Sequence, residues 1–277
     1  MTLSHRNAVF KAGIVFSSLC LILGLAALIE AVPVYGYMEG EIELRPGGIF
    51  LAFLERHLEA RLLAVHFGVL FMALFSVLSV ALIYFFFEKT QPPEILFVAF
   101  FALSFSVEVL RLALPLSRVY EIPSFYLLMA SRIILFGRYF GAFSLFAASV
   151  YAAGYRSQQQ RNPIVIIMAT TLFAAIGVPI DTQIWDSSLA MLSGYAAMFR
   201  LIEVGTFFIT VASFFIAARQ RGSREFIFIG AGSVLALAGR YILLRADTWA
   251  GFPIGLALLA IGTWLICTRL HKIYLWL

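Results

Sequence analysis

Apolar runs of about 20 residues alternate with short polar breaks along the whole chain. A transmembrane α-helix needs roughly 20 consecutive apolar residues, because it rises about 1.5 Å per residue across a hydrocarbon layer about 30 Å thick. The pattern therefore predicts an all-α polytopic membrane protein in which residues 1–277 form one transmembrane domain, a bundle of about eight helices. The predicted helices comprise residues 12–34, 62–87, 95–116, 125–153, 164–180, 197–218, 226–244 and 252–266.

The first apolar run could alternatively be read as a cleaved signal peptide. Residues 12–34 are long for the apolar region of a signal peptide, and no small-x-small cleavage site follows them. We therefore expect an uncleaved first helix. The longest polar break, residues 35–60, is acidic, and its second half, IFLAFLERHLEARLL, has the helical spacing of an amphipathic segment at the membrane interface.

Basic side chains mark the predicted cytoplasmic side. The N-terminal flank, the breaks after the fourth and sixth predicted helices and the C-terminal tail are basic, whereas the breaks after the first and fifth are acidic. The positive-inside rule then places both termini in the cytoplasm, and we expect the protein in the plasma (inner) membrane. Because this asymmetry accounts for the net charge of +5, the expected partner is the lipid bilayer and no nucleic acid is expected to bind.

Ionisable residues interrupt the predicted helices in one layer only. A charged side chain inside hydrocarbon is costly unless it is paired or faces a cavity, so each one marks a candidate site. Counting along the helices places all of them at mid-depth or towards the outer side, whereas snorkelling residues would be spread over both interfaces. The candidate site residues are Arg111, Arg132, Arg138, Arg200, Arg240, Glu108, Glu203 and His66.

The excess of arginine in this layer predicts a negatively charged ligand. A guanidinium presents a planar fork of donors that matches a carboxylate or a phosphate. We therefore expect an outward-facing pocket that binds an anionic small molecule or a lipid headgroup, in a transporter or a sensor. Arg138 lies deepest and needs a partner, and Glu108 and Glu203 are expected to orient the arginines or to accept protons. His66 is expected more as a packing side chain than as a ligand.

Two other functions fit the same layer. In a structural subunit that assembles with a partner membrane protein, the charges are internal ion pairs; every arginine then has a protein partner and no cavity remains. In an integral-membrane enzyme acting on a lipid-linked phosphate, His66 and a glutamate converge within hydrogen-bond reach beside a lipid-accessible gap. A transporter would expose the charged layer to each side of the membrane in turn. The apolar inner halves of the helices argue mildly against such a path.

Sequence motifs for cofactor chemistry are absent. HExxH, the Walker A loop, the Rossmann fingerprint and CxxCH do not occur, and the aspartates all lie in predicted outer loops. We therefore expect no cofactor and no metal site, and the balance is against an enzyme. Cys20 and Cys267 lie in the first and last apolar runs, where they are expected to be small buried hydrophobes. The topology, seven helices after a signal-like first one, is similar to that of bacterial seven-helix sensor modules.

Two further patterns concern helix packing. Residues 131–156 and 199–221 each place an arginine five residues before a glycine, followed by aromatic residues and a basic exit. This similarity predicts either a weak repeat of helical hairpins or a chance likeness between apolar helices. Small residues allow helices to approach closely. The candidates for such contacts are Gly137, Gly141, Gly205, Gly230, Gly232 and Gly239.

Overall fold

A computed structural model describes residues 3–38, 62–89, 92–154 and 161–275. Among these residues, seven helices are long and apolar enough to cross a membrane, and a further apolar helix is shorter. The prediction of an all-α polytopic membrane bundle is confirmed. The amphipathic segment expected in the second half of residues 35–60 lies outside the described residues. The long helices outside the central span are α1 (Leu3–Met38), α3 (Leu62–Phe87), α6 (Ser124–Ala152), α8 (Ala196–Arg221), α9 (Glu225–Arg245) and α10 (Gly251–Leu275), and the shorter one is α7 (Arg161–Gly177).

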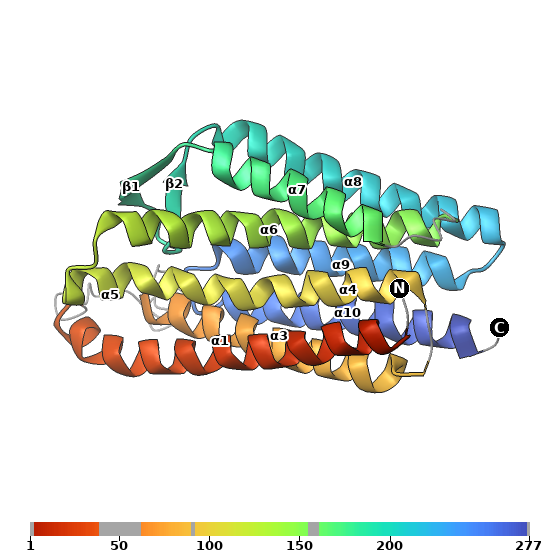
Figure 1. Ribbon diagram of the computed structural model, residues 1–277, viewed down its shortest axis with the longest axis horizontal. Coiled ribbons are helices and arrows are strands. Elements are labelled where there is room, and N and C mark those ends of the chain that lie inside the picture. Colours follow the sequence, from red (N-terminus) through yellow and green to blue (C-terminus); the bar gives the residue numbers. More distant parts are fainter. Residues whose placement is uncertain (1–2, 39–61, 90–91, 155–160, 276–277) are drawn as a thin grey trace, which may run out of the picture.

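The helices lie side by side along the long axis of the molecule (Figure 1). Leu3 of α1 and Leu275 of α10 lie at the same end of the bundle, here called the terminal end. At the opposite end, strands β1 (Ile180–Trp185) and β2 (Met191–Ser193) form an antiparallel hairpin, and this is the hairpin end. The shared position of the two helix ends agrees with an even number of crossings. The side of the membrane on which they lie stays a prediction.

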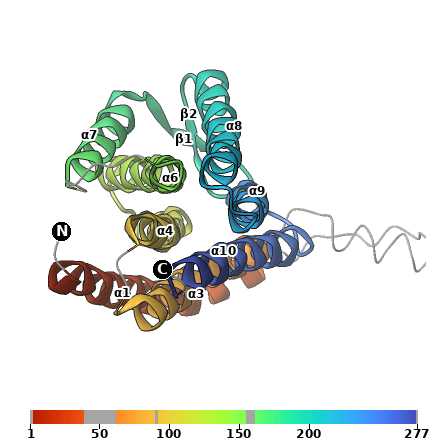
Figure 2. The same cartoon turned by 90° about the vertical axis from the view of Figure 1, so that its right-hand side faces the viewer.

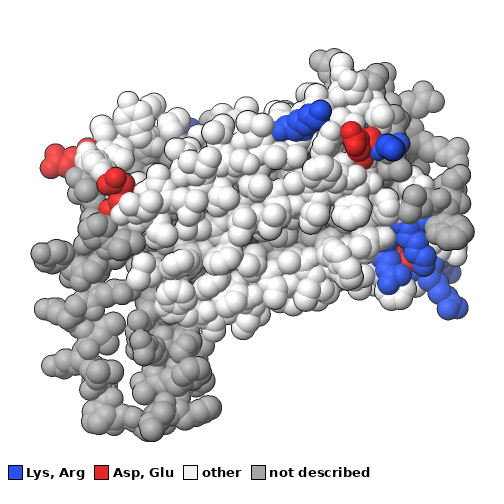
Figure 3. Space-filling model, turned by 90° about the horizontal axis from the view of Figure 1, so that it is seen from below, with Lys and Arg blue, Asp and Glu red and all other residues white. Residues whose placement is uncertain are grey.

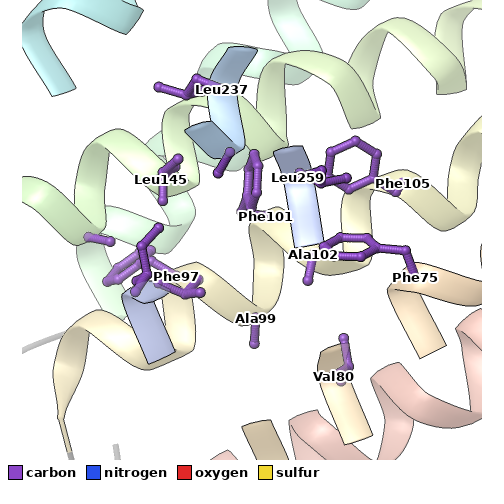
Figure 4. Close-up of a cluster of buried hydrophobic side chains, with 14 of the residues drawn as sticks. Phe75, Val80, Phe97, Ala99, Phe101, Ala102, Phe105, Leu145, Leu237 and Leu259 are labelled. Atoms are coloured by element: carbon purple, nitrogen blue, oxygen red, sulfur yellow. The ribbon is translucent and has the colours of Figure 1, made fainter. Parts of the chain in front are cut away.

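One span occupies the centre of the bundle. It consists of α4 (Pro93–Leu103), η1 (Ser104–Leu112) and α5 (Ala113–Tyr120), and its apolar part is the most buried of the seven candidate spans. Viewed along the bundle, α4 lies between α6 on one side and α1, α3 and α10 on the other (Figure 2). Three aromatic side chains of this span lie in the hydrophobic core, Phe97, Phe101 and Phe105 (Figure 4). The surrounding helices contribute to the same core Phe75, Leu145, Leu237 and Leu259.

The central span is not the uninterrupted α-helix that residues 95–116 were predicted to form. Residues 104–112 form a 3₁₀-helix, and the chain continues through Pro115 to Tyr120. Two serine hydroxyls at the start of this segment donate to carbonyl oxygens three residues earlier, from Ser104 to Phe101 and from Ser106 to Leu103, both at 2.7 Å. Such side-chain bonds compete with the α-helical pattern, and Pro115 removes one backbone donor just beyond the segment.

The fifth predicted helix, residues 164–180, has the expected length of 17 residues but lies three residues earlier in the chain, at Arg161–Gly177. Helix α7 ends at Gly177, and Ile180 already belongs to strand β1. Pro179 explains this end, because proline lacks a backbone donor and disfavours the helical conformation of the residue before it. The outer loop that was expected to follow forms instead the hairpin of β1 and β2.

Glycines bring α9 and α10 into close contact. A Cβ atom at Gly239 would lie 2.6 Å from the carbonyl oxygen of Gly255, and one at Gly262 would lie 2.6 Å from the carbonyl oxygen of Gly232. Gly232 and Gly239 on α9 are seven residues apart, as are Gly255 and Gly262 on α10, so the two glycines of each helix lie on one face of it. The prediction of close approach holds for Gly232 and Gly239, whereas Gly205 faces open space.

Charged residues at the terminal end are engaged in local contacts. Glu225 accepts bonds from Lys272 at 2.6 Å and from Arg269 at 3.0 Å, which joins α9 to α10. The buried carboxylate of Glu94 accepts a bond from the Tyr274 hydroxyl at 2.9 Å. These side chains hold the ends of α4, α9 and α10 together.

The lateral surface is apolar. In the face shown in Figure 3 the broad middle is white, with acidic side chains near one end and basic and acidic ones towards the other. Phe173, Leu201 and Phe85 are 82%, 73% and 72% exposed. Such side chains incur no penalty against lipid tails, which are as apolar as they are. The chain is therefore a multi-pass integral membrane protein.

Candidate functional site

Glu108 is the centre of a buried ion-pair cluster. Its Oε1 and Oε2 accept bonds from Nε and Nη2 of Arg138, both at 2.8 Å, in a bidentate pair. Arg111 lies on the other side, with Nη1 3.5 Å from Oε2. The Glu108 and Arg111 side chains are 2% and 1% exposed. The 3₁₀ conformation of η1 aligns residues 108 and 111, because it has three residues per turn.

Two glycines of α6 allow Arg138 to reach Glu108. A Cβ atom at Gly137 would lie 3.2 Å from the Cβ of Val107, and one at Gly141 would clash with the side chain of Ser104. With hydrogen atoms in place of side chains, α6 lies directly against η1. Close approach at these two positions was predicted from the sequence, and the structure confirms it.

Arg240 links α9 to the same point. Its Nη2 donates to the backbone carbonyl oxygen of Arg138 at 2.5 Å, and the residue is 6% exposed. Arg138 is thereby held through its side chain by Glu108 and through its backbone by Arg240. An arginine held in this way is preorganised for a ligand, because little rotamer freedom is left to lose on binding.

A cavity of about 670 Å³ opens beside Arg138, between α6, α8 and α9. The hairpin of β1 and β2 covers it at the hairpin end, and Ser187 in the turn donates to Asp247 at 2.5 Å in the connection between α9 and α10. The cavity is lined by Leu135, Arg138, Tyr139, Asp186, Ser188, Ala190, Met191, Ser193, Phe199, Arg200, Glu203, Val204, Phe207, Phe208, Leu237, Ala238, Arg240, Tyr241, Ile242, Leu244 and Arg245.

The charge balance of this lining is positive. Four arginines line the cavity against two acidic residues, Asp186 and Glu203; because Arg138 is paired with Glu108 outside the lining, one positive charge stays unbalanced. Asp186 is also engaged in the hairpin turn, where its Oδ1 accepts bonds from the backbone nitrogens of Ser188 at 3.0 Å and Ala190 at 2.9 Å. The arginines therefore face the cavity with an excess of donors over protein acceptors.

Arg200 and Glu203 do not pair with each other, although their i, i+3 spacing on α8 allows it. Glu203 lies instead near Arg245, at 3.9 Å between Oε2 and Nη2, and the Arg245 guanidinium stacks over the ring of Tyr241 at 3.9 Å. The Arg200 guanidinium makes no hydrogen bond or ion pair with any residue that the structure describes. It lies at the cavity, where a ligand can reach it.

The remaining predicted site residues lie away from the cavity. Arg111 is in the interior, and its Nε and Nη2 are buried without a hydrogen-bond partner among the described residues. His66, buried in α3, donates from Nδ1 to the carbonyl oxygen of Leu62 at 2.9 Å. Arg132, on α6, is absent from the lining. The predicted single layer is thus divided into the cavity and the interior cluster, which the Glu108–Arg138 pair connects, while Arg132 and His66 line neither.

The chain matches no known family model. A search of curated proteins and a search of solved structures also find no similar protein. The function must therefore be inferred from the cavity and its side chains.

Two cavity residues with charged side chains were missed in the sequence. Arg245 was assigned to an outer loop, although it follows Tyr241 by four residues and so continues the same face of α9. Asp186 carries no comparable signal, because only the folding of the hairpin brings it over the cavity. Within the described residues no group of three or more His, Cys, Asp or Glu side chains is placed to hold a metal ion.

Proposed function

We propose that this membrane protein binds an anionic group, a carboxylate or a phosphate, in the cavity between α6, α8 and α9, as the recognition step of transport or sensing. The observation that carries the proposal is the lining itself, four arginines against two acidic side chains around about 670 Å³. The volume is within the roughly 300–1,000 Å³ typical of small-molecule sites. Arg200 has no partner among the described residues, so its donors are available to a ligand.

The arginines have distinct roles in this proposal. Arg200 supplies a free guanidinium at the cavity, and Arg245 sits above Tyr241 close to Glu203. Nε and Nη2 of Arg138 are occupied by Glu108, so Nη1 is the nitrogen left for a ligand. Charge-assisted hydrogen bonds from such donors are roughly twice as strong as neutral ones. Glu203 lowers the net charge of the pocket when it is ionised, and ligand binding then competes with its interaction with Arg245.

The two alternatives fit the cavity less well. A purely structural subunit calls for a partner on every arginine and no remaining space, which Arg200 and the cavity do not support. An enzyme with His66 as base calls for that side chain at the cavity, and His66 is not in its lining. Anion binding accounts for both the space and the surplus of positive charge. The plasma (inner) membrane is the location we propose for this activity.

Arg200→Gln is expected to weaken anion binding without changing the fold. The probe is glycerol 3-phosphate, titrated calorimetrically into the detergent-solubilised protein at low ionic strength, where screening is weakest. Removing one charge-assisted contact should raise the dissociation constant about tenfold, which corresponds to about 1.4 kcal/mol. The side chain is exposed, so the thermal midpoint of unfolding should stay close to that of the parent protein.

Arg219→Gln is the matched control, because Arg219 is also exposed and lies on the same helix near the terminal end, outside the cavity. It should leave the dissociation constant unchanged. Equal weakening by both variants would mean that the protein attracts anions through its overall charge. Absence of binding of both glycerol 3-phosphate and an anionic lipid to the parent protein would refute the proposal.

A further inference from the structure

We propose that the occupant of the cavity is an anionic lipid of the bilayer, with its headgroup at the arginines and an acyl chain between α8 and α9. This inference rests on the proposed function and adds the chemical class of the ligand. A single carboxylate or phosphate would fill only a small part of about 670 Å³. The remaining space calls for a ligand with a second, apolar part.

On α8, the lining of the cavity changes from charged to apolar along the bundle axis. Arg200 and Glu203 lie in the first two turns of α8, next to the hairpin, whereas Phe207 and Phe208 lie further along the helix. At about 1.5 Å per residue, eight residues from Arg200 to Phe208 correspond to about 12 Å towards the middle of the bundle.

Helix α9 runs the opposite way and shows the same gradient. Arg245 and Arg240 lie near the hairpin end, and Leu237 and Ala238 lie deeper. On both helices the charged lining residues lie towards the hairpin end, and only apolar residues line the cavity deeper than Glu203 and Arg240. A lipid of the leaflet at the hairpin end has the same polarity, with its headgroup outermost and its chains pointing to the midplane.

The mouth of the cavity lies on the surface that contacts lipid. Three lining residues within the spanning parts of α8 and α9 are strongly exposed, Phe208 by 64%, Tyr241 by 49% and Val204 by 42%. An exposed side chain on the lateral face of a spanning helix faces the bilayer. A lipid thus reaches the arginines by lateral movement from the bilayer, while its chain stays in an apolar environment throughout.

Tyr241 and Arg245 form a pair that is typical of the membrane depth at which lipid headgroups lie. The guanidinium stacks on the ring at 3.9 Å, and tyrosine is enriched at membrane–water interfaces. Four arginines against two acidic residues provide the charge complementarity for an anionic headgroup and none for a cationic one. Charge and the direction of the polarity gradient therefore favour an anionic lipid.

The test compares a lipid with its headgroup alone. Dioleoyl phosphatidic acid, dioleoyl phosphatidylcholine and glycerol 3-phosphate are titrated against the detergent-solubilised protein, the lipids by native mass spectrometry. We expect phosphatidic acid to bind about tenfold or more tightly than either of the other two. Val204→Phe places a larger side chain one turn below Arg200, between the charged and the apolar parts of the cavity, so it should weaken phosphatidic acid about tenfold more than it weakens glycerol 3-phosphate.

Ile209→Phe is the matched control, because Ile209 is 54% exposed on the same helix but does not line the cavity. Ala238→Phe is a second variant that fills the deeper end between α8 and α9. Equal loss of lipid binding in the Val204 and Ile209 variants would mean that the lipid binds in the annular shell around the protein and not in the cavity, and would overturn the inference.

The outcomes separate the inference from the function on which it rests. If glycerol 3-phosphate binds as tightly as the lipid, and neither Val204→Phe nor Ala238→Phe affects the lipid, the ligand is a water-soluble anion; anion binding then stands and the lipid inference fails. If neither phosphatidic acid nor glycerol 3-phosphate binds, both fail.

Discussion

Glu108→Gln is expected to destabilise the protein by about 3–5 kcal/mol, the cost of breaking a buried ion pair by removing one partner. The substitution keeps the shape of the side chain but removes the negative charge that meets Arg138 through two 2.8 Å bonds. Arg111, which is fully buried beside it, loses its anion at the same time. Two uncompensated guanidinium groups then remain in the low-dielectric interior. The measurement is unfolding of the purified protein by increasing denaturing detergent in mixed micelles.

Arg111→Met provides the contrast. Arg111 lies at 3.5 Å from Glu108, and its Nε and Nη2 lack hydrogen-bond partners among the described residues, so their desolvation already counts against the folded state. Glu108 keeps both of its bonds to Arg138 in this variant. We expect a change in the free energy of unfolding of less than about 1 kcal/mol, or a gain. A loss as large as that of Glu108→Gln would contradict the assignment of Arg138 as the main partner.

Gly239→Val is expected to cost about 3 kcal/mol or more, at the upper end of what overpacking costs. The added Cβ would lie 2.6 Å from the carbonyl oxygen of Gly255 and would also clash with the backbone nitrogen of Leu259. Backbone atoms of a helix cannot swing aside as a flexible side chain does, so α9 and α10 must move apart. That movement also shifts Arg240, the next residue, away from the carbonyl of Arg138. We expect a lower unfolding midpoint and weaker anion binding together.

Gly205→Ala is the control for this prediction. Gly205 also lies inside a spanning helix, but a Cβ atom there meets nothing within 4 Å. Because alanine is a better helix former than glycine by roughly 0.5–1 kcal/mol, the variant should be as stable as the parent or slightly more so. A marked loss of stability at both positions would mean that α8 has a packing partner at Gly205.

The arrangement of the site follows from one requirement, that Arg138 be charged and correctly oriented at a wall of the cavity. Glu108 supplies the counter-charge from the interior side, Gly137 and Gly141 bring the two helices close enough, and Arg240 holds the backbone. The interior cluster is therefore the support of the cavity. Losses in binding that follow from Glu108→Gln are accordingly losses of orientation and net charge at Arg138.

Much of the fold was predictable from the sequence because its signals are local. Apolar runs long enough to cross the bilayer predicted the helices, and the glycines predicted close contacts at Gly137, Gly141, Gly232 and Gly239. Local signals failed where a short-range detail competed with the pattern. The serines at the start of η1 changed the helix type, and Pro179 moved the end of α7, without changing the apolar character of the segments.

The sequence by itself determined that this is a multi-pass helical membrane protein with an arginine-rich set of intramembrane charges. Only the tertiary structure decided which charges meet. Arg138 pairs with a residue 30 positions away and accepts a bond from another 102 positions away, while Arg200 and Glu203, three positions apart, stay unpaired with each other. The reason is that the lateral order and the rotation of helices in a bundle depend on side-chain packing between distant segments. The position of a residue along its own helix gives its depth in the bundle, but it does not give which residues of other helices lie beside it at that depth.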